Sequence, residues 1–443
     1  MYSRRRFLEL TGATSASLLI PRFSRGDSPN DKLNIGFIGA GGQAGFSLAG
    51  CSSENIVALA DVDDARAQGA FKKFPQARRY KDFRKMLDAE PSLDAVVIST
   101  PDHMHAPASI AAMQHGKHVY CEKPLARTIG EARQMAAIAQ ANNVITQMGT
   151  QGHAYEGSRT AVEVIRSGML GDVSELHVWS DRPGRWWPQG IERPQGDHAI
   201  PATLDWDLWL GVAPERPYHP AYVPFKWRGF WDFGTGAIGD MGVHNLDTAF
   251  WALGLSAPHS ARVVDSGPMT SESPPPWSIT EITFAKTKAR PVIKFFWYDG
   301  GKKPPRELFH DAGDKIPTNG SLVVGKHATL YTRTWHGGTK PEDLFLLLPR
   351  KQFADFTPGA PSLPRPASHH REWIDAIKRG QQAPESSSFA YAAKLTETLL
   401  VGNLALRLGR EVLWDAAKMQ VPGVPEADQY IKPTYRHGWK LST

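Results

Sequence analysis

The chain has 443 residues, of which 41% are hydrophobic and 22% charged, and its formal net charge is +6. This length allows two or three domains around a large core, and no apolar run reaches the roughly 18 residues that a membrane-spanning helix needs. The basic residues are scattered and accompany no recognition motif, so the charge indicates no nucleic-acid partner. Cys51 and Cys121 are the only cysteines, which excludes a framework of several disulfides.

The first 30 residues have the pattern of an export signal. Arg4, Arg5 and Arg6 precede a weakly apolar stretch, residues 8–20, and a polar segment rich in Ser, Pro, Gly and Asn follows. This order is typical of a twin-arginine signal and a linker, and it predicts a periplasmic or otherwise exported protein. A basic tail on a cytoplasmic protein is the alternative, because residues 21–29 contain no clean cleavage site flanked by small residues.

Residues 31–150 alternate between short apolar strands and helices. The predicted strands are 33–38, 55–60, 93–99, 118–121 and 144–148, and the predicted helices between them are 43–53, 64–74, 106–115 and 128–142. Strands rich in Val and Ile, each followed by a helix, indicate a parallel sheet that is covered on both faces. With right-handed crossovers, this segment is predicted to be a doubly wound Rossmann domain.

The turn after the first strand carries a dinucleotide-binding motif. The pattern Gly-x-Gly-x-x-Ala is formed by Gly39, Ala40, Gly41, Gly42, Gln43 and Ala44. Gly39 permits a tight turn, Gly41 lets the backbone approach a pyrophosphate, and Ala44 allows the helix to pack closely on the strand. Asp61 closes the second strand about 20 residues later, where a carboxylate accepts hydrogen bonds from ribose hydroxyls. Because its charge repels a 2′-phosphate, NAD is favoured over NADP.

The loops after two later strands are expected at the same edge of the sheet. Residues 99–105 (Ser-Thr-Pro-Asp-His-Met-His) follow the central strand, and residues 121–124 (Cys-Glu-Lys-Pro) follow the next one. Lys123 would then place an ammonium beside the nicotinamide and the substrate hydroxyl, where it lowers the hydroxyl pKa and stabilises an alkoxide. A solvated surface lysine is the alternative.

These motifs together resemble the Gfo/Idh/MocA family, named for glucose-fructose oxidoreductase, inositol dehydrogenase and a rhizopine-catabolism protein. The resemblance covers nearly everything after residue 32, and its Glu-Lys-Pro triplet is fairly specific. It implies that Lys123 is the catalytic lysine and that the nicotinamide half of NAD is bordered by Thr100, Pro101, His105 and Glu122. It also implies a homo-oligomer that associates through an open sheet of the second domain.

Residues 151–443 are predicted to form a second, α+β domain for substrate binding and oligomerisation. Alternating patterns predict strands of an open, predominantly antiparallel sheet at 173–180, 278–284, 291–298 and 321–324. Helices are predicted at 155–167, 372–378 and 391–408, and a polar tail follows residue 422.

Seven of the 14 tryptophans lie between residues 179 and 231. Flat indole rings suit the C–H faces of a sugar, although packing in the core between the domains is the alternative for any single Trp. Arg185, Trp186 and Trp187 lie in a loop between Gly184 and Pro188, so they are the expected substrate contacts.

A second chemical motif lies in residues 234–247. If the segment is helical, Asp240, His244 and Asp247 share one face. A carboxylate next to an imidazole raises its basicity, which makes His244 a candidate acceptor of the substrate's hydroxyl proton. In the resembled family this pattern supplies an Asp and a His that complete the catalytic group with the lysine. A zinc site is the alternative, but no further pair of ligands with suitable spacing accompanies it, so no metal is predicted.

The predicted function is NAD-dependent hydride transfer at a hydroxyl-bearing carbon of a sugar, inositol or glycoside. Lys123, Asp240 and His244 are the predicted catalytic residues, and Asp240 and His244 are also expected to contact substrate. Two alternatives remain. One is cleavage of a glycosidic bond through transient oxidation, with NAD recycled in place, and the other is a nucleotide- or sugar-sensing protein without turnover.

Overall fold

A computed structural model describes residues 32–313, 315–334 and 345–441. The predicted export signal and linker, residues 1–30, lie outside these ranges. No helix in the described part of the chain is long and apolar enough to cross a membrane. Cys51 and Cys121 are both buried free thiols.

The first sheet is parallel and has the strand order β3-β2-β1-β4-β5-β6. Its strands are β1 (Asn34–Ile38), β2 (Asn55–Ala60), β3 (Arg78–Tyr80), β4 (Ala95–Ile98), β5 (His118–Cys121) and β6 (Thr146–Met148). Every residue of the central strand β4 is buried, as expected for a strand covered on both faces. The strand order reverses between β1 and β4, which is where open parallel sheets bind ligands. The predicted Rossmann fold is confirmed.

Three of the helices described in this domain begin at side-chain caps. The helices of the domain are α1 (Ala44–Gly50), α2 (Asp64–Lys73), α3 (Phe83–Ala89), α4 (His105–Gln114) and α5 (Ile129–Ala141). Asp63 and Asp82 accept hydrogen bonds from the first turns of α2 and α3, and Thr128 and Glu131 form a capping box at α5. Each such cap contributes about 1 kcal/mol. The short pair β3 and α3 was not predicted.

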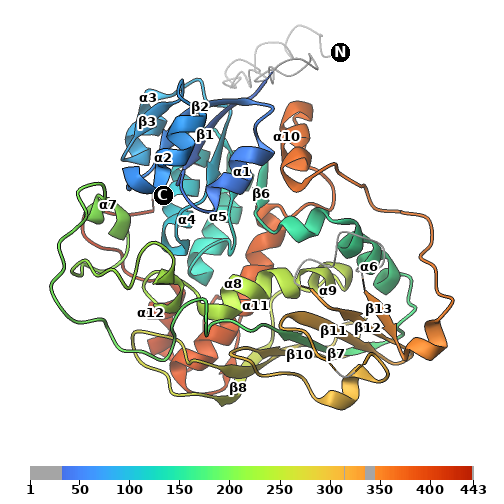
Figure 1. The fold of residues 1–443 in the computed structure, drawn as a ribbon. Coiled ribbons are helices and arrows are strands. Elements are labelled where there is room, and N and C mark those ends of the chain that lie inside the picture. Colours follow the sequence, from blue (N-terminus) through green and yellow to red (C-terminus); the bar gives the residue numbers. More distant parts are fainter. Residues whose placement is uncertain (1–31, 314, 335–344, 442–443) are drawn as a thin grey trace, which may run out of the picture.

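In the described part of the chain, the second sheet has eight strands in the order β13-β12-β11-β7-β10-β9-β8-β14. They are β7 (Val173–Trp179), β8 (Ser260–Ser266), β9 (Ser278–Phe284), β10 (Ile293–Tyr298), β11 (Gly320–Gly325), β12 (Thr329–Thr332), β13 (Leu346–Leu348) and β14 (Val412–Leu413). Among the described strands of this sheet, only β7 and β10 pair in parallel, so the predicted, predominantly antiparallel sheet is confirmed. Figure 1 shows helices over one face of this sheet.

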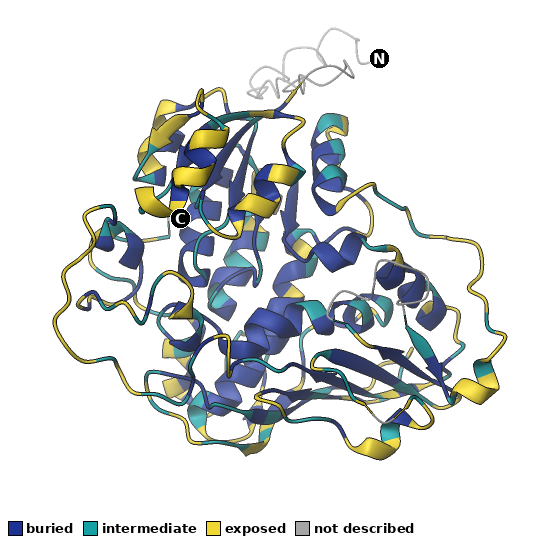
Figure 2. Cartoon of the chain, viewed as in Figure 1, coloured by how far each residue is buried: buried dark blue, intermediate teal, exposed yellow. Residues whose placement is uncertain are grey.

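The remaining helices follow the last strand of the first sheet in the chain. They are α6 (Glu156–Arg166), α7 (Trp206–Leu210), α8 (Gly236–Asn245), α9 (Asp247–Ala252), α10 (His369–Arg379), α11 (Phe389–Leu408) and α12 (Asp428–Ile431). Helix α11 contacts α5 of the first domain as well as α8 and strands β8 and β9, and it is almost wholly buried (Figure 2). Helix α10 packs Trp373, Ile374 and Ile377 into the same apolar cluster as Ile35 and Phe37 of β1. The last third of the chain therefore also completes the first domain.

Candidate active site

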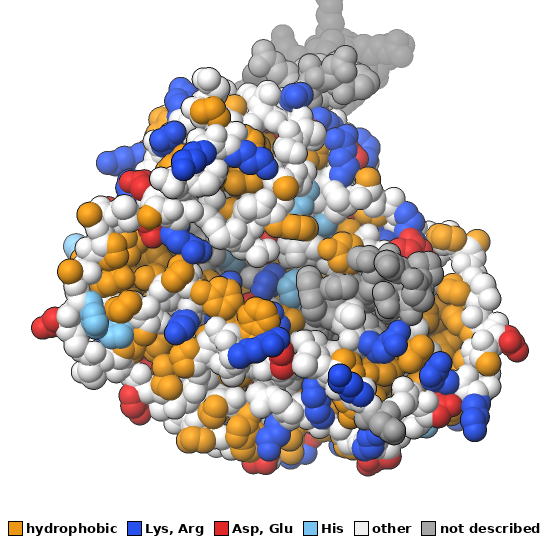
Figure 3. Space-filling model, viewed as in Figure 1, with side chains coloured by type: hydrophobic (Ala, Val, Ile, Leu, Met, Phe, Trp, Pro, Cys, Tyr) orange, Lys and Arg blue, Asp and Glu red, His pale blue; other side chains and the backbone are white. Residues whose placement is uncertain are grey.

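A cavity of about 740 Å³ lies at the carboxyl ends of the Rossmann strands. Its lining includes the glycine turn after β1, the loops after β4 and β5, residues of α8, and the 3-10 helix Lys226–Gly229. Figure 3 shows a hollow between the two domains with basic side chains in it. A site of this size and place is typical of a cofactor-binding cleft.

The glycine turn has the geometry that the motif predicts. Gly39 has a φ of +81°, and a Cβ there would lie 2.8 Å from the backbone carbonyl of Ser99. A Cβ on Gly41 would lie 2.8 Å from the carbonyl oxygen of Arg66. Any larger residue would therefore clash at both positions, and the backbone remains open toward the cavity, as close approach of a pyrophosphate requires.

Asp61 lies against this turn. Its Oδ2 accepts hydrogen bonds from the backbone amides of Ala40 (2.8 Å) and Gly41 (3.0 Å), and burial raises the pKa of its carboxyl group. Arg66 adds a cation at the same end of the cavity, because its Nη2 lies 2.8 Å from where a Cβ of Gly42 would be. The residues fit a dinucleotide. A carboxylate favours NAD while a neighbouring arginine suits a 2′-phosphate, so the two together do not choose between NAD and NADP.

Most of the predicted cofactor residues line this cavity, namely Gly39, Gly41, Gly42, Gln43, Asp61, Thr100, Pro101, Glu122 and Lys123. Ala44 is buried at the start of α1, as close packing of the helix requires. His105 is also buried and does not line the cavity. Its Nδ1 and Nε2 lie 2.8 and 2.9 Å from the carbonyl oxygens of Pro124 and Thr100, so it holds the loops after β4 and β5 together from beneath.

Lys123 and Asp240 meet inside the cavity. The Nζ of Lys123 donates to Oδ1 of Asp240 at 2.6 Å, and the side chains are 14% and 8% exposed. Arg228 and Arg182 approach the same carboxylate, with their Nε atoms 3.3 and 3.6 Å from its oxygens. Burial by itself raises the pKa of Asp240, but attraction by Lys123, Arg228 and Arg182 outweighs it and holds this pKa well below its ordinary value.

The two arginines were missed from the sequence. Arg182 lies three residues after β7, and Arg228 lies in the 3-10 helix Lys226–Gly229. Neither position belongs to a recognisable motif. The signal that the sequence offers is that both arginines lie close to tryptophans along the chain. In the structure, Arg182 lies 4.3 Å from the ring of Trp186, and Arg228 lies 4.1 Å from that of Trp227.

His244 lines the same cavity, one helical turn after Asp240 on α8. Asp240 uses its carboxylate to hold Lys123 and the two arginines. The expected common face with Asp247 was wrong. Helix α8 ends at Asn245, so Asp247 begins α9 and faces a different set of partners.

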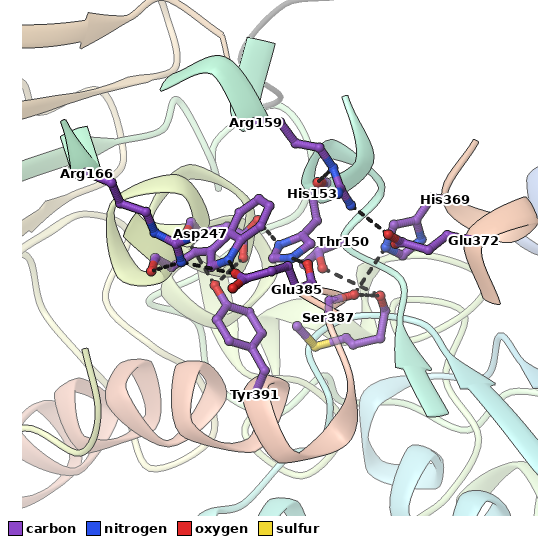
Figure 4. A network of polar contacts seen from close by, with 12 residues as sticks. Thr150, His153, Arg159, Arg166, Asp247, His369, Glu372, Glu385, Ser387 and Tyr391 are labelled. Atoms are coloured by element: carbon purple, nitrogen blue, oxygen red, sulfur yellow. Dashed lines mark hydrogen bonds and ion pairs between the residues drawn. The ribbon is translucent and has the colours of Figure 1, made fainter. Parts of the chain in front are cut away.

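Asp247 belongs to a buried polar network within the second domain (Figure 4). Its carboxylate lies 2.8 Å from Nδ1 of His153 and accepts a 2.6 Å hydrogen bond from the hydroxyl of Tyr391. The imidazole of His153 stacks on Trp251 at 4.0 Å, and its Nε2 lies 2.9 Å from the carbonyl oxygen of Glu385. The network therefore ties α9 to the N-terminal turn of α11 and to the segment that follows β6.

Of the predicted substrate contacts, Trp186 lines the cavity and is 36% exposed. Trp187 is only 1% exposed, and its Nε1 donates to Oε1 of Gln189 at 2.9 Å, so it belongs to the core and its prediction as a substrate contact was wrong. Arg185 lies outside the lining, with a side chain that is 75% exposed and paired with Asp181. Trp206 and Trp209 pack in a buried aromatic cluster, although Trp209 also borders the cavity.

Two buried acids complete the lining. Asp102 accepts a 2.9 Å hydrogen bond from the hydroxyl of Thr235, and Glu122 accepts one of 3.1 Å from Gln151. Burial raises the pKa of each to about 7. Both acids therefore change charge near neutral pH, in contrast to Asp240.

Replacing Asp102 tests this charge change. A raised pKa favours the protonated acid in the folded protein, so the stability it contributes is complete below the ordinary Asp value of about 4 and is lost as pH rises through about 7. Asp102→Asn cannot ionise. Between pH 5.5 and 8.5 we expect the melting temperature of Asp102→Asn to fall less than that of the wild type. The two decreases should differ by about 2 °C or more. The exposed Asp265→Asn is the control, and identical pH slopes for Asp102→Asn and wild type would contradict this account.

No group of three or more His, Cys, Asp or Glu side chains within the described ranges is placed to hold a metal ion. The fold and the cavity thus define a two-domain protein with a dinucleotide-binding domain and a lysine–aspartate pair at the edge of its sheet. A model of an oxidoreductase family with an NAD-binding Rossmann fold, Gfo/Idh/MocA, matches residues 33–150, and a model of that family's C-terminal α/β domain matches residues 158–287. Together they span more than half of the chain, which therefore belongs to the Gfo/Idh/MocA oxidoreductase family.

Several curated relatives match part of the chain. Levoglucosan dehydrogenase of Pseudarthrobacter phenanthrenivorans is 26% identical over 239 residues, which are 50% of this chain and 51% of the relative. Inositol 2-dehydrogenase of Rubrobacter xylanophilus is 32% identical over 164 residues, 35% and 45% of the two chains. A glycosyl hydrolase family 109 protein of a Shewanella species is 27% identical over 226 residues, 44% and 49% of the two chains. The chain spans about half the length of these relatives.

Solved structures share the fold at lower sequence identity. An aldose-aldose oxidoreductase from Caulobacter crescentus superposes with a TM-score of 0.58 at 17% identity, covering 86% of this chain and all of the other. A levoglucosan dehydrogenase in complex with NADH gives a TM-score of 0.56 at 19% identity, covering 86% and 98%.

Proposed function

We propose that this protein transfers a hydride between NAD and a hydroxyl-bearing carbon of a sugar, inositol or glycoside. The observation that carries the proposal is the Lys123–Asp240 pair, which lies in the same cavity as the glycine turn and His244. The partial matches to sugar and inositol dehydrogenases support this substrate class.

The chain's own residues suit the oxidation of an alcohol. Bound NAD supplies the hydride acceptor. Asp240 holds the ammonium of Lys123 in place, and this ammonium donates to the substrate oxygen as negative charge develops on it. His244 accepts the hydroxyl proton.

Native mass spectrometry of the purified protein, followed by absorbance during addition of sugars, inositols and glycosides, tests the proposal. We expect bound NAD whose reduced-nicotinamide absorbance rises with one substrate class. A protein that binds no dinucleotide, as purified or after NAD is added, contradicts the proposal. A protein that binds NAD without any turnover favours the sensing alternative.

Cleavage of a glycosidic bond through transient oxidation is the second candidate, and the match to a glycosyl hydrolase family 109 protein favours it. In this reaction the cofactor returns to its starting state. Release of an aglycone with no lasting change in nicotinamide absorbance distinguishes it from net oxidation.

We also propose that the chain is exported by the twin-arginine route. The arginines at positions 4–6 and the weakly apolar stretch that follows support this proposal. A protein that carries its cofactor out of the cytoplasm has no NAD pool to draw on, so export favours tight binding and recycling in place. Association of copies through the second sheet stays a prediction.

The two neighbouring tryptophans allow a matched test of the substrate side. Trp186→Ala removes an apolar platform from the cavity, and we expect the KM for the sugar to rise about tenfold with little change in the Kd for NAD. Trp187→Phe removes a buried hydrogen bond instead, which costs about 1–3 kcal/mol of stability. Because Gln189 keeps its bond from the amide of Ala237, α8 stays anchored and KM should be unchanged. A larger KM effect at Trp187 than at Trp186 would reverse these assignments.

A further inference from the structure

Three cations share one carboxylate at the substrate end of the cavity. Lys123, Arg228 and Arg182 come from three different parts of the chain, and their nitrogens lie 2.6, 3.3 and 3.6 Å from the oxygens of Asp240. Their side chains are only 14%, 18% and 17% exposed. Mostly buried charges of one sign are costly unless they are balanced, so two positive charges here lack an equal counter-charge from Asp240.

The neighbouring acids do not remove this surplus. Among the described residues that line this end of the cavity, the other carboxyl groups are Asp102 and Glu122, and burial raises the pKa of each to about 7. Each therefore carries only part of a negative charge at neutral pH. Asp181 also attracts Arg182, but it shares its charge with the exposed Arg185, 3.5 Å away. The nicotinamide ring of an oxidised cofactor would add a further positive charge.

Both guanidinium groups lie over aromatic rings, and Arg228 is also held by hydrogen bonds from its Nε to Asp240 (3.3 Å) and from its Nη1 to the carbonyl oxygen of Phe225 (3.2 Å). Arg228 lies 4.1 Å from the ring of Trp227 and 4.3 Å from that of Phe225, and Arg182 lies 4.3 Å from that of Trp186. The Nε of Arg182 is buried and donates no hydrogen bond. A planar, pre-oriented guanidinium with unused donors is suited to a carboxylate or phosphate group.

These arginines are distinct from the turn that suits the cofactor phosphates. That turn is formed by residues 39–44, and the basic side chain beside it is Arg66, which lies over Gly42. Arg182 and Arg228 instead surround Asp240, the acid that holds Lys123. Their charge is therefore available to the substrate.

We propose that the substrate is an anionic sugar, whose carboxylate or phosphate group binds Arg182 and Arg228 while a neighbouring hydroxyl lies at Lys123. This inference rests on the proposed function and narrows its substrate class. The carbon that is oxidised loses a hydride to NAD, and the hydroxyl group on that carbon loses its proton to His244. The anionic group is unchanged by the reaction. Neutral sugars leave the positive surplus in place and bind more weakly.

Calorimetric titration of the protein saturated with NADH tests the inference, because the reduced cofactor prevents oxidation during the measurement. The probes are D-glucuronate, D-gluconate and D-glucose phosphate, each compared with D-glucose, together with the same set in the galactose series. We expect at least one anionic probe to bind about tenfold or more tightly than its neutral partner, and this preference to weaken as salt is added. The tighter of the carboxylate and phosphate probes identifies the group.

Variants locate the preference. Arg182→Gln is expected to remove most of the preference for the anionic probe over its neutral partner, and Arg182→Lys, which keeps the charge without the planar fork, should restore part of that preference. Arg410→Gln, at an exposed position after α11, is the control. Equal binding of charged and neutral probes, including no binding of either, overturns the inference, as does a preference that survives in Arg182→Gln. Failure of the wild type to bind NADH contradicts the proposed function instead.

Discussion

Lys123→Met is expected to lower kcat at least about a thousandfold while the Kd for NAD changes little. Methionine fills a similar volume, so the wall of the cavity is kept, but the ammonium that lies 2.6 Å from Asp240 is gone. The substrate oxygen then develops its charge with no donor beside it. The glycine turn and Asp61, which fit the dinucleotide, are held by their own hydrogen bonds, in which Lys123 takes no part.

Steady-state kinetics with the substrate found by the sugar panel, together with a fluorescence titration of NADH, measure the two effects. Lys394→Met, at an exposed position of α11, is the matched control and should have wild-type activity. Turnover in Lys123→Met within tenfold of the wild type would remove this lysine from the mechanism. Loss of NADH binding in the variant would instead assign it to the cofactor site.

Asp240→Asn is expected to cost about 3–5 kcal/mol of the free energy of unfolding at pH 7, because three mostly buried cations lose their shared counter-charge. Denaturation with urea measures this loss. The surface pair of Arg371 and Asp375 on α10 is the contrast, since Asp375→Asn breaks an exposed pair and should cost less than about 1 kcal/mol.

The pH dependence gives a second check on Asp240. The carboxyl pKa is depressed in the folded protein, so the stability it contributes is complete above the ordinary Asp value of about 4 and is lost only as pH falls through the folded value. The difference in the free energy of unfolding between Asp240→Asn and the wild type should therefore be nearly constant from pH 5.5 to 8.5. A difference that disappears within this range would show that Asp240 is not ionised in the folded protein.

The first domain and its cofactor turn could be predicted because their requirements are local. Gly39 needs a positive φ, Gly41 must have no Cβ because the backbone of Arg66 lies against it, and Asp61 must follow the second strand. Each requirement therefore fixes a residue type at a set position in the sequence. Lys123 was predicted by its place at the carboxyl end of a strand. The alternation of apolar residues likewise identified strands β9 and β10.

The features that were missed depend on contacts between distant segments. Arg182 and Arg228 have no local pattern, and only the tertiary fold brings them to Asp240. Asp247 was placed on one face with Asp240 because the helix was assumed to continue past Asn245. Trp186 and Trp187 are adjacent in sequence, yet their side chains diverge, one into the cavity and the other into the core.

The packing of α10 has a consequence for the order in which the chain folds during synthesis. His370 lies 3.0 Å from the hydroxyl of Ser47 on α1, although the two residues are 323 positions apart. Trp373 and Ile377 cover apolar residues of β1 in the same way. The domain that leaves the ribosome first is thus the last to be covered, and its core stays partly exposed until the C-terminal helices are made. Chains that stop before residue 369 should aggregate through this surface.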